Sequence, residues 1–344
     1  MAIIVNPSNV QIGLYVLCES STGICFTGSA RALRFNDSSP LWGASFGYAS
    51  GGRCDGPVST CMFTQIDKFP FATDTCAVEA GNLSSFGRHG TAGVSSQVNG
   101  YVIAGYGGSP VPVSTHRSCI ERFPFTAPFA TTSNVGNLTD AGRYGVAGAS
   151  SPVSGYAMGG LRQGTRYSCI EKFNFSSESS VCVIGGLTNA LSYTAGISSL
   201  ENGYAAGAST PTTYLACIDK FPFATNSGKV MMGLLCTCMA VGSGVSSSIS
   251  GYHIGGSTPT TGCSTIQKFP FATDSPATSV GNFICAFTNS AGISSQQSGY
   301  NAGGNNPTGT VNTINRFPFA SETCSKAVGT LSTNPRYQPS GTQD

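Results

Sequence analysis

The amino-acid sequence predicts an all-β protein, a β-propeller of four-stranded blades. Three observations predict it: a motif that returns about every 48 residues, side chains that alternate within each short segment, and frequent turn residues. The 344 residues include 45 Gly and 18 Pro, and no segment sustains the 3.6-residue period of a helix. Four short strands in a repeat of about forty to fifty residues are the pattern of propeller blades.

The clearest repeated segment has an aliphatic residue, one variable residue, a basic residue and Phe. It reads IDKFPFAT from Ile66 and again from Ile218, and six copies are present. We expect this segment to be the third strand of each blade, ended by the following Pro, which cannot donate to a strand ladder. The basic residues, at spacings of 54, 50, 48, 48 and 48 residues, are Lys68, Arg122, Lys172, Lys220, Lys268 and Arg316.

Three further segments keep the same period and supply the other strands. A small-residue AGxSS segment is the expected first strand, a GYxxGG segment is the second, and the stretch ending near VGNL is the fourth. The recurrent tyrosine of the second segment should pack between blades, with its hydroxyl group hydrogen-bonded. These tyrosines are Tyr48, Tyr101, Tyr156, Tyr204, Tyr252 and Tyr300.

The chain ends decide the number of blades. Residues 42–335 contain six full repeats, and residues 336–344 follow a segment that resembles the approach to a first strand. Residues 1–41 include QIGLYVL and ICFTGSA, which could be the remaining strands of a blade shared between the two ends. We therefore favour seven blades closed by N- and C-terminal strands. The alternative is six blades with an N-terminal arm and a C-terminal closing strand or tail.

The recurrent basic residue has two interpretations. It could form a ring of positive charge that captures an anionic ligand, or an ion pair repeated between blades, with its aliphatic stem packed on Phe. The second is preferred. Among the 14 cysteines, Cys54 and Cys61 could face each other across one hairpin and Cys18 and Cys25 across another, and a disulfide is open for each pair.

Composition excludes several classes of function. Only 9% of residues are charged, the net charge is +2, and there is no basic cluster, which argues against a nucleic-acid partner. No apolar run is long enough for membrane insertion, and the N-terminus lacks the pattern of a signal peptide. The three histidines, His89, His116 and His253, occupy different repeat positions, and no catalytic motif is present. We predict no enzyme activity, no cofactor and no metal.

The repeats resemble those of the kelch family. A diglycine ends the second strand, an aromatic follows in the third, a Leu closes the fourth, and Arg88 and Arg143 precede a first strand. The Trp typical of the family's fourth strand is missing, since the only Trp is Trp42, and the Phe residues of FPFAT would supply its bulk. The resemblance covers roughly residues 40–335 and implies a kelch-like propeller.

The amino-acid sequences of the repeats resemble those of a narrower group, the virion-associated propellers of marine and cyanobacterial bacteriophages. That resemblance implies a structural or adhesion protein of the virion, assembled in the host cytoplasm: a tail fibre, baseplate or capsid-decoration propeller. Its partners would be other virion proteins or a host surface glycan or protein. The alternatives are a cellular kelch-type protein-binding module and, with less support, a sugar-active enzyme. Function is expected in irregular loops such as Gly107 to Arg117 and Gly160 to Tyr167.

Overall fold

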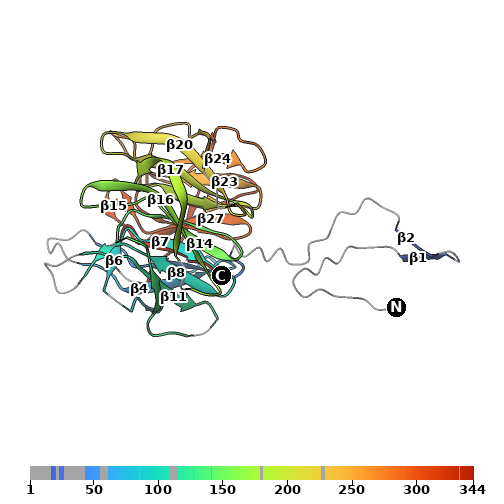
Figure 1. The fold of residues 1–344 in the computed structure, drawn as a ribbon, viewed down its shortest axis with the longest axis horizontal. Coiled ribbons are helices and arrows are strands. Elements are labelled where there is room, and N and C mark those ends of the chain that lie inside the picture. Colours follow the sequence, from blue (N-terminus) through green and yellow to red (C-terminus); the bar gives the residue numbers. More distant parts are fainter. Residues whose placement is uncertain are drawn as a thin grey trace. The chain divides into compact units, whose positions relative to one another are not determined.

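The computed structural model describes most of the chain, and its described elements are all strands (Figure 1). The residues outside the description are 1–16, 21–22, 27–42, 55–60, 85, 109–114, 127, 141, 179–180, 226–228 and 333. Contacts divide the chain into two units, Met1–Ser39 and Pro40–Asp344. In the first unit, β1 (Leu17–Ser20) pairs antiparallel with β2 (Gly23–Phe26).

The second unit contains six antiparallel sheets built on four strands each, and each sheet is written below from its first strand to its fourth. The first three are β32 (Ser340–Gln343), β3 (Phe46–Ser50), β4 (Gln65–Pro70), β5 (Val78–Asn82); β7 (Ala92–Ser95), β8 (Asn99–Ile103), β11 (Cys119–Pro124), β12 (Ser133–Asn137); and β13 (Ala147–Ser150), β14 (Ser154–Met158), β16 (Thr165–Asn174), β17 (Cys182–Leu191). The last three are β18 (Ala195–Ser198), β19 (Asn202–Ser209), β20 (Tyr214–Pro222), β21 (Val230–Leu234); β22 (Ser243–Ser246), β23 (Ser250–Ile254), β24 (Thr265–Pro270), β25 (Thr278–Asn282); and β26 (Ala291–Ser294), β27 (Ser298–Ala302), β30 (Thr313–Pro318), β31 (Lys326–Thr330).

Each predicted segment forms the strand that its pattern indicates. The AGxS segments are first strands, the GY segments second strands, and the segments with the basic residue third strands. Five third strands end at their Pro, and the remaining one, β16, ends at Asn174 in the same position. Every sheet has a register shift between its third and fourth strands just after the recurrent Ile, a repeated bulge that bends the outer strand.

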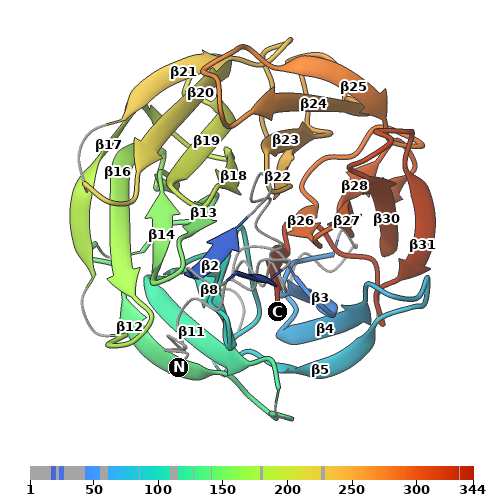
Figure 2. The ribbon, with the colours of Figure 1, turned by 90° about the vertical axis from the view of Figure 1, so that its right-hand side faces the viewer.

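The six sheets of the second unit surround a common centre, with the first strands innermost and the fourth strands outside (Figure 2). The first strands contact one another in the order β7, β13, β18, β22, β26 and β32, and β32 contacts β7 again. The described residues thus contain six such sheets, one fewer than the favoured count of seven and equal to the six-blade alternative.

The C-terminal strand explains the difference in count. The repeat that begins at Phe46 starts with a second strand, so it lacks a first strand of its own. Strand β32 supplies that strand by pairing with β3, from Gly47 opposite Gln343 to Ser50 opposite Ser340. The C-terminus therefore completes the first repeat. Apart from β1 and β2, the residues 1–41 expected to complete the closing blade lie outside the description.

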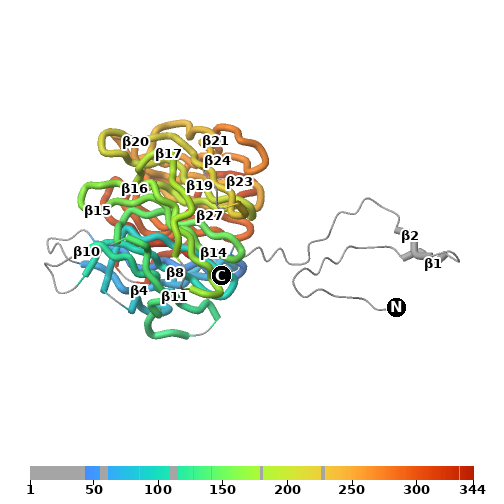
Figure 3. Tube along the Cα trace, in the orientation of Figure 1, coloured from blue at the N-terminus to red at the C-terminus, as the bar shows by residue number. Residues whose placement is uncertain are grey.

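Short additional strands lie between the second and third strands of three sheets, and one more, β6, lies just before the first strand β7. Strands β6 (Arg88–His89), β9 (Tyr106–Gly107) and β10 (Thr115–His116) form one small sheet, and β15 (Leu161–Arg162) pairs with β16. Strands β28 (Asn305–Asn306) and β29 (Gly309–Thr310) form another. Strands β10 and β15 lie on the same side of the second unit (Figure 3). The described loop from Gly160 to Tyr167 lies on this side as well, because it contains β15.

Candidate functional site

Four of the six recurrent basic residues form ion pairs with an acid of the next sheet. The pairs are Arg122–Glu178 (2.8 Å), Lys220–Asp274 (2.8 Å), Lys268–Glu322 (2.5 Å) and Arg316–Asp74 (2.9 Å). Each acid lies in the turn between the third and fourth strands of its sheet. These half-exposed pairs connect neighbouring sheets, and each contributes at most about 1 kcal/mol in such a setting.

The other two recurrent lysines contact aromatic rings. The Lys68 ammonium lies 3.7 Å from the centre of the Phe46 ring, and the Lys172 ammonium lies 5.9 Å from the centre of the Tyr156 ring. Both are cation–π distances. Four of the six basic residues therefore link neighbouring sheets, and Lys68 and Lys172 contact rings of their own sheets.

The recurrent tyrosines also lie at the seams. Each Tyr packs on the two Phe of the next sheet; for example, the Tyr156 ring lies 5.4 Å from Phe221 and 4.7 Å from Phe223. Tyr300 of the sixth sheet packs in the same way on Phe69 and Phe71 of the first. The tyrosines thus lie between neighbouring sheets. The same packing is found for the remaining recurrent tyrosines, Tyr48, Tyr101, Tyr204 and Tyr252.

The tyrosine hydroxyl groups show how far the repeats diverge. Tyr101 donates to Glu178 at 3.0 Å, and Tyr252 donates to Glu322 at 3.2 Å. The buried Tyr204 hydroxyl has no partner among the described residues. The expected hydrogen bond is therefore missing where the next sheet carries Asp274, which is one methylene shorter than Glu and pairs with Lys220 alone of these two groups.

Buried ion pairs inside the first three sheets were not foreseen. Arg88 pairs with Glu121 at 2.7 Å and Arg143 with Glu171 at 2.8 Å, and Arg336 pairs with Asp67. All six side chains are about 1% exposed or less. The acids that precede the recurrent basic residue thus point into the sheet. The signal was present in the sequence, because the repeats with the Arg before the first strand also carry that acid.

The other three sheets have no such ion pair among their described residues. In the fifth sheet, Gln267 takes the position of the acid and donates to the Met239 sulfur at 3.4 Å. In the sixth sheet, Asn315 donates to Asn301 at 2.9 Å. In the fourth, Asp219 remains and accepts from the N–H and hydroxyl groups of Thr188, both at 2.7 Å.

The innermost residues form three rings around the axis. We call the first the axial hydrogen-bond ring. In it, the backbone N–H of each residue donates to the carbonyl group of the equivalent residue in the preceding sheet, at 2.6–3.1 Å. The sixth bond leads back to the first residue, so the series is closed. All six residues have φ between 55° and 64°, which is costly for the β-branched Val241. Its members are Gly90, Gly145, Tyr193, Val241, Asn289 and Gln338.

The second ring, the glycine ring, explains why the first strands contain Gly. A Cβ atom built on any member would lie 2.0–2.3 Å from the carbonyl oxygen of the neighbouring member, so only glycine fits. Its members are Gly93, Gly148, Gly196, Gly244, Gly292 and Gly341.

The third ring, the hydroxyl ring, closes the other end of the first strands. Each backbone N–H donates to the side-chain oxygen of the next member at 2.9–3.4 Å, and the series again returns to its start. Its members are Ser95, Ser150, Ser198, Ser246, Ser294 and Gln343.

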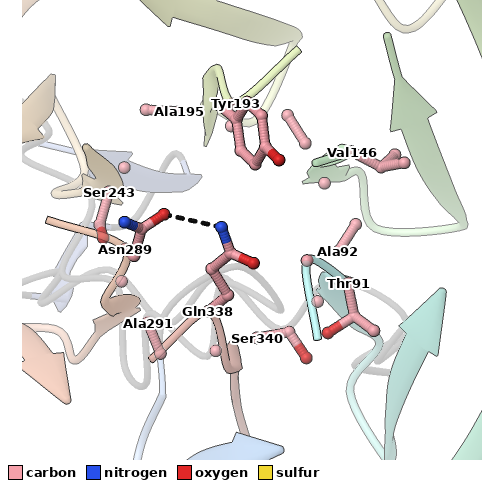
Figure 4. Close-up of a pocket in the computed structure, with 18 of the residues that line it drawn as sticks. Thr91, Ala92, Val146, Tyr193, Ala195, Ser243, Asn289, Ala291, Gln338 and Ser340 are labelled. Atoms are coloured by element: carbon pink, nitrogen blue, oxygen red, sulfur yellow. Dashed lines mark hydrogen bonds between the residues drawn. The ribbon is translucent and has the colours of Figure 1, made fainter. Parts of the chain in front are cut away.

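A cavity of about 130 Å³ lies on the axis between the axial hydrogen-bond ring and the glycine ring. Its described lining residues carry hydroxyl and amide groups and no carboxylate. Tyr193, Asn289 and Gln338 reach into it, and the Gln338 amide donates to Asn289 Oδ1 at 2.9 Å (Figure 4). The cavity is therefore polar and neutral.

An aromatic rim adjoins this cavity; we use the name for Tyr106, His116, Tyr144, Tyr193 and His89. Tyr106 lies 5.1 Å from His116 and 5.5 Å from Tyr144, measured between ring centres. Tyr193 lies 5.9 Å from Tyr144, and His89 lies 5.8 Å from Tyr106 and shares a hydrogen bond with Gln338. The rim joins residues of three sheets, and it brings together two of the three histidines that sequence positions kept apart.

Burial lowers the pKa of both rim histidines. Burial lowers the pKa of His89 to about 4, against the effect of its hydrogen bond with Gln338. Burial and then the charge of Arg162 lower the pKa of His116. Burial also raises the pKa of Tyr193, and its hydrogen bond with Tyr144 adds to that effect. Among the described residues no three His, Cys, Asp or Glu side chains are close enough to hold a metal ion.

Because of the third histidine, His253, we expect the protein to lose stability in acid. It is fully buried in the fifth sheet, neither ring nitrogen has a partner among the described residues, and burial lowers its pKa from 6.5 to about 4. The unfolded chain therefore binds more protons than the folded chain between these values. The free energy of unfolding should fall by roughly 3 kcal/mol as the pH drops from 6.5 to 4, on account of this residue.

Urea denaturation at a series of pH values measures this effect. The matched variant is His253→Asn, since Asn301 occupies the equivalent position of the sixth sheet. The variant should lose the His253 share of the acid dependence while His89 keeps its own. An unchanged pH slope in the variant would contradict the assignment.

The two cysteine pairs lie opposite each other in their hairpins. The Cys54 N–H donates to the Cys61 carbonyl group at 3.0 Å, and both side chains are free thiols in the structure. Burial, together with the neighbouring Cys54 thiol, raises the pKa of Cys61 to about 11. Cys18 and Cys25 are paired in register across β1 and β2, and their side chains lie outside the description.

These features define the class of the protein as a propeller-like all-β protein with four-stranded antiparallel sheets around an axis. No family model matches the sequence, and no curated protein matches it. Among solved structures, one titled "Structure of YjhT" matches with a TM-score of 0.63 and 10% identity, covering 84% of this chain and 99% of that chain. At this identity the likeness concerns the fold alone. The described residues include no helix that could span a membrane.

Proposed function

We propose that this chain is a closed six-bladed propeller of kelch-like repeats and a non-enzymatic interaction protein of a bacteriophage particle. In this proposal each four-stranded sheet is a blade, and β32 closes the ring. The protein would sit in a tail fibre, a baseplate or a capsid decoration. It would bind other virion proteins or a molecule of the host surface.

The observation that carries this proposal is the separation between regular and irregular residues. The residues that recur in every repeat hold blades together: the Tyr–Phe contacts, the ion pairs at the seams and the three axial rings. The residues that break the repetition gather at the aromatic rim, on the side of the loops that follow the second strands. A rigid scaffold with divergent loops on one face is a common design of binding proteins.

The proposed location in a phage particle rests on the similarity of the repeat sequences to those of virion-associated propellers. The axial cavity adds a further argument for binding, because its described lining has no carboxylate that could act as a general acid or base. Among the described residues, the rim histidines have no group of three His, Cys, Asp or Glu side chains beside them that could hold a metal ion.

Mass spectrometry of purified particles tests the proposal. Particles banded on a density gradient should contain this chain in a fixed ratio to the major capsid protein, and a salt wash should not remove it. A host cytosolic protein serves as the control for contamination. Absence of the chain from every particle fraction would overturn the phage setting. Turnover of a sugar by the recombinant protein would favour the sugar-active alternative instead.

A further inference from the structure

The two ends of the blades differ in how their charges are paired. At the turns between third and fourth strands, Asp74, Glu178, Asp274 and Glu322 neutralise the recurrent cations. The opposite end, after the second strands, carries arginines from the irregular loops. The acid described there, Asp140, pairs with the buried Arg143 at 2.6 Å. Arg162 and Arg166, from the loop that follows β14, form no ion pair with a described carboxylate.

The arginines at the loop end have neutral partners. Arg166 donates to Ser192 Oγ at 3.0 Å and to the Ser209 carbonyl group at 3.1 Å. Arg162 has no carboxylate within 4.0 Å among the described residues. A guanidinium group held by neutral acceptors keeps its full charge for a carboxylate or phosphate, which it binds through two parallel hydrogen bonds.

The arginines lie directly beside the aromatic rim. Leu161, which precedes Arg162, pairs with Tyr144 through two backbone hydrogen bonds of 2.8 and 3.0 Å. Arg162 is also close enough to His116 for its charge to lower the pKa of that residue. Arg166 binds Ser192, the neighbour of Tyr193. Arg162 therefore lies near Tyr144 and His116, and Arg166 lies near Tyr193.

Polar groups without partners lie next to these rings. His116 Nε2, His89 Nε2 and the hydroxyl group of Thr91 are buried and have no hydrogen-bond partner among the described residues. Thr91 lines the axial cavity together with the amides of Asn289 and Gln338 (Figure 4). Buried polar groups are normally satisfied, so each such atom is a candidate contact for a ligand.

We propose that the aromatic rim, with Arg162 and Arg166, binds a saccharide that carries a carboxylate or phosphate group. Arg162 would hold the anionic group, the rim tyrosines would cover the apolar face of the sugar ring, and the cavity amides would bind its hydroxyl groups. This assignment rests on the proposed function and names the ligand class for the same face.

The ring geometry favours a saccharide over a nucleotide. The rim rings are inclined to one another, at 68° for Tyr106 with His116 and 82° for Tyr144 with Tyr193. No two of these rings are parallel, so they do not form a slot for a flat base. Inclined rings and a neutral cavity of hydroxyl and amide groups suit a rounded ligand with many hydroxyl groups.

Ligand titrations of the purified chain, followed by saturation-transfer NMR and calorimetry, test the proposal. The probes are glucuronate, glucose 6-phosphate, glucose and AMP. Saturable binding of glucuronate, of glucose 6-phosphate or of both is expected, and the arm that binds identifies the anionic group. Glucose should bind at least about tenfold more weakly, because it lacks the charge-assisted hydrogen bonds. Equal binding of glucose, stronger binding of AMP, or no saturable binding would overturn the proposal.

Three variants locate the site. Arg162→Gln and Tyr106→Leu should each weaken binding about tenfold or more while the melting temperature stays near that of the parent chain. Arg122→Gln is the matched control, since it removes an arginine from the opposite end of the blades, where Glu178 is its partner. An equal loss in the control would place binding elsewhere. Failure of sugar binding in a chain that still co-purifies with particles would refute this ligand class alone.

Discussion

Replacement of Arg336 by methionine is expected to lower the free energy of unfolding by about 3–5 kcal/mol, because it leaves the Asp67 carboxylate buried without its cation. Both side chains are completely buried, and Arg336 also donates to the Ala49 carbonyl group at 3.3 Å. The pair joins the C-terminal segment to the first repeat, so its loss acts on the sheet that both ends of the second unit complete. The shift in the midpoint of urea denaturation measures the effect.

The chain itself offers the control for that experiment. Met239 and Gln267 are the neutral counterparts of the pair in the fifth sheet, where the Gln267 amide contacts the Met239 sulfur. The double variant Arg336→Met with Asp67→Gln should therefore recover most of the lost stability, since replacing both charges removes the unpaired one. A double variant as unstable as the single one would show that the loss arises from packing and not from the unpaired charge.

Replacement of Gly244 by alanine is the second substitution with a large expected effect. The new Cβ atom would lie 2.1 Å from the Gly196 carbonyl oxygen, and backbone cannot move aside as a flexible side chain can. The first strands would have to separate, which we expect to cost about 3 kcal/mol, the upper end of the usual range for overpacking. Thermal and urea denaturation of the purified variant measure the loss.

Gly185→Ala is the matched control. Gly185 lies in the fourth strand β17, and a Cβ atom built there meets nothing within 4 Å. This variant should stay within about 0.5 kcal/mol of the parent chain. If Gly244→Ala were equally harmless, the first strands would not be in the close contact that the glycine ring requires.

The strands could be predicted from the sequence because their signals are local. Alternation in Ile120 to Phe123 and the Pro at position 124 lie within one segment, and the third strand β11 ends where that Pro predicts. The favoured count of seven blades was not matched among the described residues, which contain six sheets. The number could not be read from the sequence because it depends on which sheet the C-terminal strand joins. The pairing of Gln343 with Gly47 connects residues almost a whole chain apart.

The candidate site was the least predictable part. The irregular loops after the second strands were expected to carry function, and Tyr106 and His116 flank one of them. Their contacts with Tyr144 could not be inferred, because the three residues belong to two repeats that meet only in the folded chain. The partner of Glu121 was hidden for a similar reason, since Arg88 precedes it by 33 residues.

The sequence by itself thus determined the repeat, its four strands and the residues that recur in each one. Repetition is a property of the order of residues, and a periodic pattern of apolar and polar side chains is sufficient to define short strands. Only the tertiary structure decided which sheet the C-terminus completes, which arginine meets which acid, and where the irregular residues gather. These contacts join residues that are far apart in the sequence, and they form only when the strands have assembled into sheets around a common axis.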